Sequence, residues 1–214
     1  MRAVRVHASI LTLLSFLAVL AAGCAGPMAR DVPVSLRYTP VIKELPPPAA
    51  RVVSIGIFRD ARQGRPEGIV GERVRFTQET DRFKVQDGAA GALVGVLQGY
   101  FAKRGARTER SRWDGTPADL WNQGGDLALS GRITHLWLSA TDHATRGEAS
   151  SVIRLEIVAG SPKSGAIITK SIQIEPSKKS NLFFETRQIE EWLSESLSEA
   201  VERVLPELER RLVL

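Results

Sequence analysis

DLALSGRITHLWLSATD, residues 126–142, opens the part of the sequence that decides the fold. It is rich in residues that favour strands, and two similar stretches follow it, SVIRLEIVAG (151–160) and GAIITKSIQIE (165–175). The links between the three stretches are short and contain turn-forming residues, whereas parallel strands need a long crossover. The pattern therefore predicts an antiparallel meander of three strands.

The residues before the meander predict further strands and one short helix. RVVSIGIF (51–58) is mostly apolar, as a buried strand is, and IVGERVRF (69–76) is typical of a strand on weaker grounds. ARTERS (106–111) is a short strand candidate. TPADLWNQG (116–124) predicts a short helix with Thr116 as its N-cap.

Two longer helices are expected at 87–105 and 185–212. The first has apolar residues at helical spacing, with Asp87 placed to cap its start and Gly105 to end it. The second carries one apolar stripe along its length, and Pro206 is expected to kink or restart it. The stripe consists of Ile189, Trp192, Leu193, Leu197, Ala200, Val201, Val204 and Leu208.

The order of these elements predicts an α+β fold. We expect a mixed, largely antiparallel sheet with a C-terminal three-strand meander, packed on one face by two main helices. Residues 51–214 are expected to form this single α+β domain, and to fold without the residues before them.

Residues 24–50 are rich in proline and are expected to form a tether between the domain and its anchor. One part of this segment leaves an alternative open. Across 32–38, Val32, Val34, Leu36 and Tyr38 alternate with other residues, which is also typical of an edge strand.

Residues 1–23 have the pattern of a secretory signal peptide. Arg2 and Arg5 precede the uncharged stretch ILTLLSFLAVLAA (10–22), which is too short for a membrane-spanning helix. Small residues then lead into Cys24, the single cysteine of the chain. This arrangement resembles the bacterial lipobox.

The lipobox resemblance implies a lipid anchor on Cys24. In that family the thiol receives a diacylglyceryl group, the chain is cut before the cysteine, and the new amine is acylated. These acyl chains are the only non-protein group expected, and they make the membrane a partner of the protein. Ala25 is not the Asp that resembles an inner-membrane retention signal, so we expect anchoring in the bacterial outer membrane with the domain facing the periplasm.

Charge and cysteine content exclude several classes of site. The formal net charge is +5, and loss of Arg2 and Arg5 with residues 1–23 reduces it to +3, so nucleic acid is not an expected partner. With Cys24 lipidated, no thiol remains for a disulfide or a cysteine metal site. His135 and His143 lack the spacing of zinc ligands, and no metal is expected.

The sequence contains no motif of a known catalytic site. It has no Gly-x-Ser-x-Gly turn and no phosphate-binding Gly-Lys-Ser/Thr ending. The acids Asp60, Glu67 and Glu72 lie near the first strands, where ordinary surface carboxylates are also found. We therefore expect that the protein is not an enzyme.

Three glycines in the helix at 87–105 are candidates for an interface. Gly91, Gly95 and Gly99 recur every fourth residue, so they lie on one flank of the helix, away from its apolar stripe. Each costs the helix roughly 1 kcal/mol relative to alanine. Close packing against the protein's own sheet or last helix explains them, and so does a partner helix or subunit.

A run of basic residues follows this helix. Lys103, Arg104, Arg107, Arg110 and Arg112 surround one acid, Glu109. Together with Lys178 and Lys179 they are candidates for contact with anionic lipid or lipopolysaccharide head groups. An ordinary solvated face is the alternative interpretation.

Several of these stretches resemble the YajG-like family of bacterial envelope lipoproteins. The resemblance is carried by the lipobox at Cys24, VSIGIFRDAR (53–62), YFAKRGA (100–106), LALSGRITHLWL (127–138) and NLFFETRQIEEWLSESLSEAVERVL (181–205). It implies an envelope lipoprotein without known catalytic residues. The auxiliary lipoproteins of ABC transport systems share this layout and are a competing resemblance.

Two functions are compatible with the sequence. The first is a non-enzymatic, lipid-anchored envelope lipoprotein whose domain binds another envelope protein at the periplasmic face. The alternative is an accessory lipoprotein of a lipid or lipopolysaccharide transport system, which requires an apolar groove or an ABC partner. The sequence favours the first.

Overall fold

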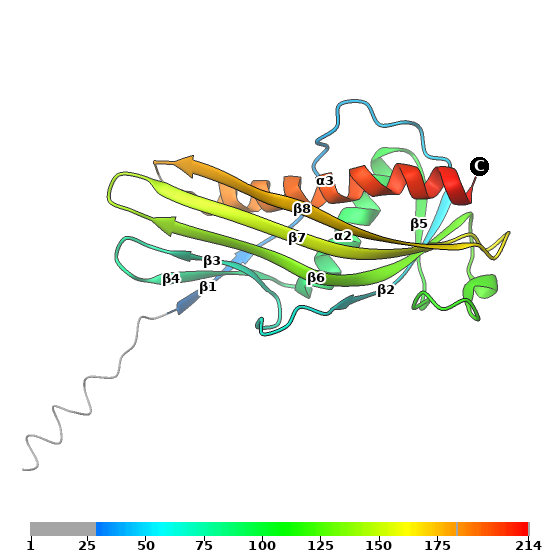
Figure 1. Ribbon diagram of the computed structural model, residues 1–214, viewed down its shortest axis with the longest axis horizontal. Helices are drawn as coiled ribbons and strands as arrows, with labels where there is room; N and C mark the ends of the chain where they lie inside the picture. The colour runs from blue at the N-terminus through cyan, green and yellow to red at the C-terminus, as the bar shows by residue number, and fades with distance from the viewer. Residues whose placement is uncertain (1–28, 183, 214) are drawn as a thin grey trace, which may run out of the picture.

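The computed structural model describes residues 29–182 and 184–213, with the backbone alone for 175–177 (Figure 1). Residues 1–23 and Cys24 lie outside these ranges. In chain order the strands are β1 (Ala29–Val34), β2 (Val52–Asp60), β3 (Ile69–Val74), β4 (Thr80–Val85), β5 (Arg107–Arg110), β6 (Leu127–Asp142), β7 (Gly147–Gly160) and β8 (Ile167–Asn181). The helices are α2 (Gly88–Lys103), the short 3-10 helix η2 (Leu120–Asn122) and α3 (Thr186–Leu212).

The three C-terminal strands form the predicted antiparallel meander. β6 pairs with β7 from Ala128–Gly160 to Asp142–Gly147, and β7 pairs with β8 along almost its whole length. β6 matches its predicted bounds closely, whereas β7 begins at Gly147, before the predicted residue 151, and β8 ends at Asn181, beyond the predicted residue 175. β6, β7 and β8 run side by side as long strands, and their curvature is plain in Figure 1.

The other edge of β6 is shared by two strands, which splits the sheet into two arms. β2 pairs in parallel with the first half of β6, and β5 pairs in parallel with β2. β3 pairs in parallel with the second half of β6, followed by β4 and then β1 at the edge. Between the arms, the buried guanidinium of Arg62 donates hydrogen bonds to the carbonyl oxygens of Ile69 (2.7 Å) and Leu136 (3.0 Å).

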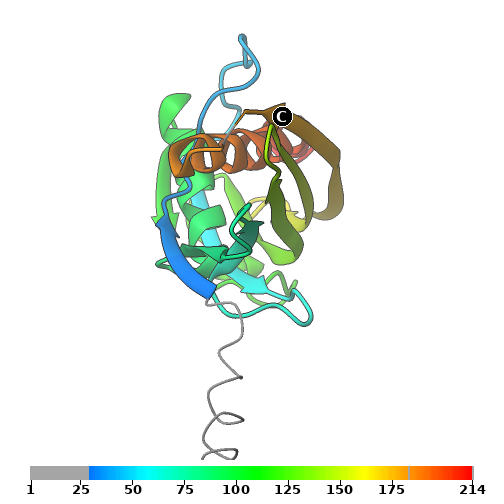
Figure 2. The same ribbon diagram turned by 90° about the vertical axis from the view of Figure 1, so that its left-hand side faces the viewer.

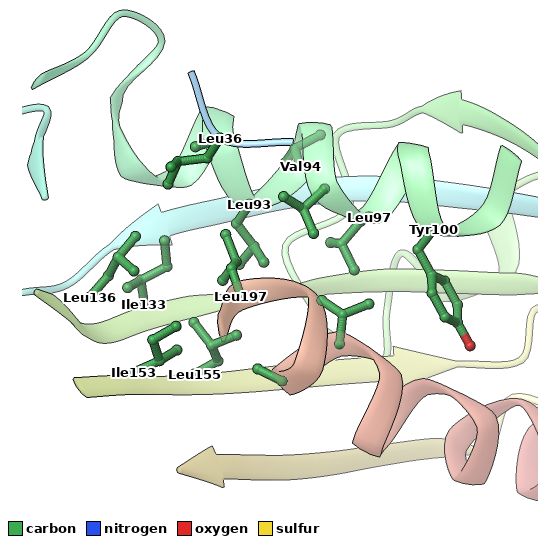
Figure 3. Packing of buried hydrophobic residues seen from close by; sticks show 14 of the residues in the cluster. Leu36, Leu93, Val94, Leu97, Tyr100, Ile133, Leu136, Ile153, Leu155 and Leu197 are labelled. Carbon is green, nitrogen blue, oxygen red and sulfur yellow. The ribbon is translucent and has the colours of Figure 1, made fainter. Parts of the chain in front are cut away.

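The mixed α+β architecture and the two-helix layer are as the sequence predicts. α2 and α3 cover the same face of the sheet (Figures 1 and 2). Figure 3 shows Leu93 and Leu97 of α2 beside Leu197 of α3, above side chains of β6 and β7. All three leucines are fully buried. The apolar stripes of both helices are therefore core surfaces.

Three local predictions differ from the structure. The helix expected at 116–124 is only η2, and Thr116 instead uses its carbonyl oxygen to accept a hydrogen bond from the Trp113 indole (2.8 Å). β4 was not predicted, because its sequence TDRFKV is short and contains three charged residues and only two apolar ones. α3 runs through Pro206 without a restart, since Leu205 and Leu208 are buried on either side of it.

Residues 29–50 belong to the folded unit. The prediction that 24–50 is a tether and that the domain begins at Arg51 is therefore wrong for residues 29–50. β1 pairs in parallel with all of β4, which confirms the edge-strand alternative with earlier bounds. Val34 and Leu36 are buried in the main core, and Ala50 is fully buried. We call residues 35–50 the strap.

Within the described ranges, no helix has the combined length and hydropathy that crossing a membrane requires.

Candidate functional site: a groove beside strand β1

An open groove of about 630 Å³ lies between the edge strand β1, helix α2 and the first turns of α3. The apolar part of its wall comes from Val34, Leu36 and Val85, which close the core beneath it. The remaining lining residues are Asp31, Pro33, Ser35, Lys84, Gln86, Asp87, Gly91, Ala92, Gly95 and Glu190. The groove thus has an apolar floor and a polar rim, as ligand and peptide grooves have.

The three glycines that the sequence singles out have different surroundings. Gly91 and Gly95 line the groove, whereas Gly99 is covered by the strap. A Cβ atom at Gly99 would lie 2.7 Å from the Cβ of Tyr38, so this glycine is required by packing within the chain. A Cβ atom at Gly95 would meet nothing within 4 Å. Internal packing therefore explains Gly99 and does not explain Gly95.

The rim of the groove carries charges of both signs. Asp31 pairs with Arg82 (2.6 Å) and Lys84 (3.5 Å), and the hydrogen bond from Arg82 holds the pKa of Asp31 below its usual value. Glu190 lies 3.7 Å from Arg37. Pro33 has no backbone N–H, which restricts the addition of another strand to this edge. The groove is better suited to side chains or to a helix than to an extended peptide.

The strap is held on α3 by a ladder of polar side chains that sequence reasoning missed. Ser194, Ser198 and Glu202 follow one another every fourth residue on α3, and Glu209 lies two turns further on. Each accepts hydrogen bonds from backbone N–H groups of the strap. The bonds are Arg37 to Ser194 (3.3 Å), Thr39 to Ser198 (2.9 Å), Val41 (3.1 Å) and Ile42 (2.7 Å) to Glu202, and Ala49 to Glu209 (2.8 Å).

The two glutamates of this ladder are buried and also bind side chains. Tyr38 donates its hydroxyl to Glu202 at 2.6 Å, and burial together with this carboxylate raises the pKa of Tyr38. Glu209 pairs with Arg104 at 2.5 Å. The Arg104 guanidinium also donates to Tyr100 and to the carbonyl oxygen of Pro46. Arg104 is therefore a structural residue, and its proposed contact with anionic lipid is wrong.

The other predicted basic residues remain on the surface. Lys103, Arg107, Arg110 and Arg112 are exposed around the end of α2 and β5, and Arg107 pairs with Glu109 (2.5 Å). Lys178 and Lys179 are not part of this group. They lie near the end of β8, which pairs with the start of β7 at the opposite end of the sheet.

The histidines and first-strand carboxylates do not come together as a catalytic constellation. Burial, reinforced by the charge of Arg154, lowers the pKa of His135 in the middle of β6. Asp60 is occupied by Arg62 at 2.7 Å, and the hydrogen bonds from that guanidinium lower its pKa. Among the described residues, no group of three or more histidine, cysteine and acidic side chains is placed to hold a metal ion.

Comparison with known proteins identifies likeness in fold. No family model matches the chain, and no curated protein matches it. A solved Xanthomonas campestris protein of the family DUF330 is similar over 84% of this chain and 95% of its own, with a TM-score of 0.51 and 10% identity. Two further solved structures have lower TM-scores. An uncharacterized protein is similar over 86% of this chain and 99% of its own, with a TM-score of 0.47 and 9% identity. A putative neuraminyllactose-binding hemagglutinin homolog from Helicobacter pylori is similar over 84% of this chain and 98% of its own, with a TM-score of 0.41 and 13% identity. At such identities, the likeness to the Xanthomonas protein extends to the fold alone.

Proposed function

We propose that this protein is a non-enzymatic bacterial envelope lipoprotein, anchored in the outer membrane through Cys24, whose periplasmic domain binds another envelope protein. The observation that carries the proposal is the position of Cys24, the single cysteine, directly after an uncharged apolar stretch and small residues. That pattern resembles the lipobox, and its family implies the anchor. Three acyl chains would hold the protein stably, since one chain alone binds only marginally.

The groove beside β1 is the proposed binding surface. It combines an apolar floor with Gly95, whose missing side chain no residue of the described chain replaces. A helix that retains such a glycine loses roughly 1 kcal/mol relative to alanine, and a partner that packs closely against it explains the retention. Gly91 and Gly95 line the groove and have no side chains, so such a partner would come closest to the backbone of α2 at these two residues.

Crosslinking in intact cells tests this surface. A photo-reactive amino acid in place of Gly95 is expected to give one discrete adduct with an envelope protein. The matched control places the same residue at Gln173, which is exposed on β8 next to two buried isoleucines that point to the helices. Adducts of equal yield and identity at both positions would show that the groove is not selective. An adduct with phospholipid in place of protein would favour the transport-accessory function.

A further inference from the structure

One end of the molecule gathers the start of the described chain and several strand ends. β1 is parallel to β4, β4 is antiparallel to β3, and β3 is parallel to β6. The pairing places Ala29 beside Thr80, Thr80 beside Val74, and Val74 beside Thr141. The β3–β4 turn, the β6–β7 turn and the end of β8 therefore share one end of the sheet. We call it the anchor end; Figure 2 looks onto it.

A lipid on Cys24 would keep the anchor end close to the membrane. Only five residue steps separate Cys24 from Ala29, and a fully extended chain of that length spans at most about 18 Å. β6 contains 16 residues, so the sheet is on the order of 50 Å long at about 3.3 Å per residue. The exposed residues Arg107 and Arg110 of β5 lie toward the far end, beside the start of β2.

Two large apolar side chains are exposed at the anchor end. Phe76 in the β3–β4 turn is 64% exposed, and Leu182, which follows β8, is 69% exposed. Phe76 lies two residues beyond the Val74–Thr141 pair, and Leu182 lies one residue beyond the Asn181–Gly147 pair. Both are therefore at the level of the β6–β7 turn. Apolar side chains at such a position can insert among lipid head groups.

A cluster of arginine side chains lies at the base of the β3–β4 turn. Arg30, Arg73 and Arg75 share the single buried carboxylate of Asp81, at 3.0, 2.5 and 2.8 Å. Arg30 keeps most of its side chain exposed, and Arg75 about a third. Because three guanidinium groups meet one carboxylate there, this cluster retains an excess of positive charge, which Asp142 near Arg73 (3.9 Å) offsets in part.

A polar groove of about 600 Å³ opens on the strands of the meander at the same end. Hydroxyl groups and basic side chains line it, among them Ser139, Ser150, Ser180, Arg146 and Lys178. One carboxylate, Glu148, also lines the groove and pairs with Arg146 at 2.7 Å. Hydroxyl donors beside a lysine and an arginine match the phosphate oxygens of a phospholipid head group.

We infer that the anchor end is a membrane-docking surface that binds anionic phospholipid head groups while Phe76 and Leu182 enter the interface. This inference rests on the proposed lipid anchor, because the anchor is what brings this end to the bilayer. Docking would orient the long axis of the sheet away from the membrane. The groove beside β1 would then lie at a defined height in the periplasm.

Binding of the unlipidated chain, residues 25–214, to vesicles tests the surface independently of the anchor. Vesicles of phosphatidylethanolamine and phosphatidylglycerol at 3:1 are compared with pure phosphatidylcholine in a sedimentation assay. We expect salt-sensitive binding to the first only. The double variant Arg146→Glu/Lys178→Glu should bind roughly tenfold or more weakly, since each basic residue near such a surface contributes about 1 kcal/mol.

The matched control is Arg110→Glu/Arg112→Glu at the far end, which should leave binding unchanged. Circular dichroism verifies that each variant is folded. Greater weakening by the far-end pair, or equal binding to phosphatidylcholine, would overturn the inference.

Orientation is tested with the lipidated protein in the same vesicles. An environment-sensitive dye on Phe76→Cys is expected to shift to the blue on reconstitution. The same dye on Trp121→Cys, an exposed aromatic position within η2, is expected not to shift. A shift at 121 without one at 76 would refute docking by the anchor end. Absence of lipid on Cys24 would instead refute the proposed function, so the two failures are distinguishable.

Discussion

At the scale of single residues, Glu202 of α3 binds three hydrogen-bond donors of the strap. Its carboxylate accepts hydrogen bonds from the Tyr38 hydroxyl and from two backbone N–H groups of the strap. Glu202→Ala leaves these donors without their acceptor and should lower the free energy of unfolding by about 1–3 kcal/mol. Denaturant titration measures this loss. Glu199→Ala, which removes only an exposed pair with Arg203, should cost less than about 0.5 kcal/mol; equal costs would contradict the role of Glu202.

Two glycines of α2 should respond to alanine with opposite signs. Gly95→Ala fills open space and should raise the free energy of unfolding by up to about 1 kcal/mol, the difference in helix propensity. Gly99→Ala would press against the Cβ of Tyr38 and displace the strap, so it should lower the melting midpoint. Thermal unfolding measured by circular dichroism compares the two variants. Stabilisation by both would show that Tyr38 does not restrict Gly99.

The pH dependence of stability should reflect Asp81. Burial alone would raise its pKa, but the hydrogen bonds from Arg73 and Arg75 outweigh burial and hold the pKa below its ordinary value of 3.8. The unfolded chain therefore takes up this proton first as the pH falls. The stabilisation by Asp81 is present above about pH 4 and is lost as the pH falls toward the lowered pKa.

Asp81→Asn should therefore be less stable than the wild type at pH 7 and should lose less stability between pH 5 and pH 2. Urea titrations across this range measure the slope. Glu148→Gln, at an exposed position of β7, is the control that should leave the slope close to that of the wild type. An unchanged slope in Asp81→Asn would contradict the argument.

At the scale of elements, β1 and the strap matter most for stability. A chain that begins at Arg51 lacks the buried side chains of Val34 and Leu36, and it lacks the hydrogen-bond donors of the strap. Burial of each such side chain contributes roughly 1.5–3 kcal/mol, which is a large share of the 5–15 kcal/mol of a typical domain.

The shortened chain should therefore melt at a clearly lower temperature than the chain that begins at residue 25, or fail to unfold cooperatively. Calorimetry compares the two proteins at the same concentration. Equal midpoints would show that residues 29–50 are a dispensable tether after all.

The elements differ in how far the sequence could predict them. The meander and the two long helices have strong periodic patterns, and tertiary packing preserves those patterns. α3 continues through Pro206 without a restart, because the buried leucines on both sides outweigh the lost hydrogen bond. β1 and β4 are short, and Pro33 and five charged residues weaken their strand signal. Their pairing depends on contacts that are remote in sequence.

The candidate site was predictable only in part for a similar reason. The spacing of Gly91, Gly95 and Gly99 indicated that they share one flank of α2, but it could not show that Tyr38 covers Gly99. Arg104 and Arg107 are equivalent basic residues in sequence, yet one is buried beside Glu209 and the other is exposed. Ser194, Ser198 and Glu202 do follow helical spacing, but the spacing does not reveal what they bind.

At the scale of the whole molecule, the split sheet carries a strap across its last helix, a groove at its edge strand and the anchor end. The described chain begins at that end, next to the groove. The proposed anchor, docking surface and partner-binding groove would thus follow one another along the long axis of the sheet. The proposed anchoring depends on lipid attachment at Cys24, which would bring the anchor end to the bilayer.

Mass spectrometry of the N-terminal peptide of the protein purified from membranes tests this attachment most directly. We expect a peptide that begins at Cys24 and carries the mass of a diacylglyceryl group and one further acyl chain. Cys24→Ala should yield an unprocessed chain without lipid. An unmodified peptide that continues through residues 20–27 in the wild-type protein would contradict the central claim.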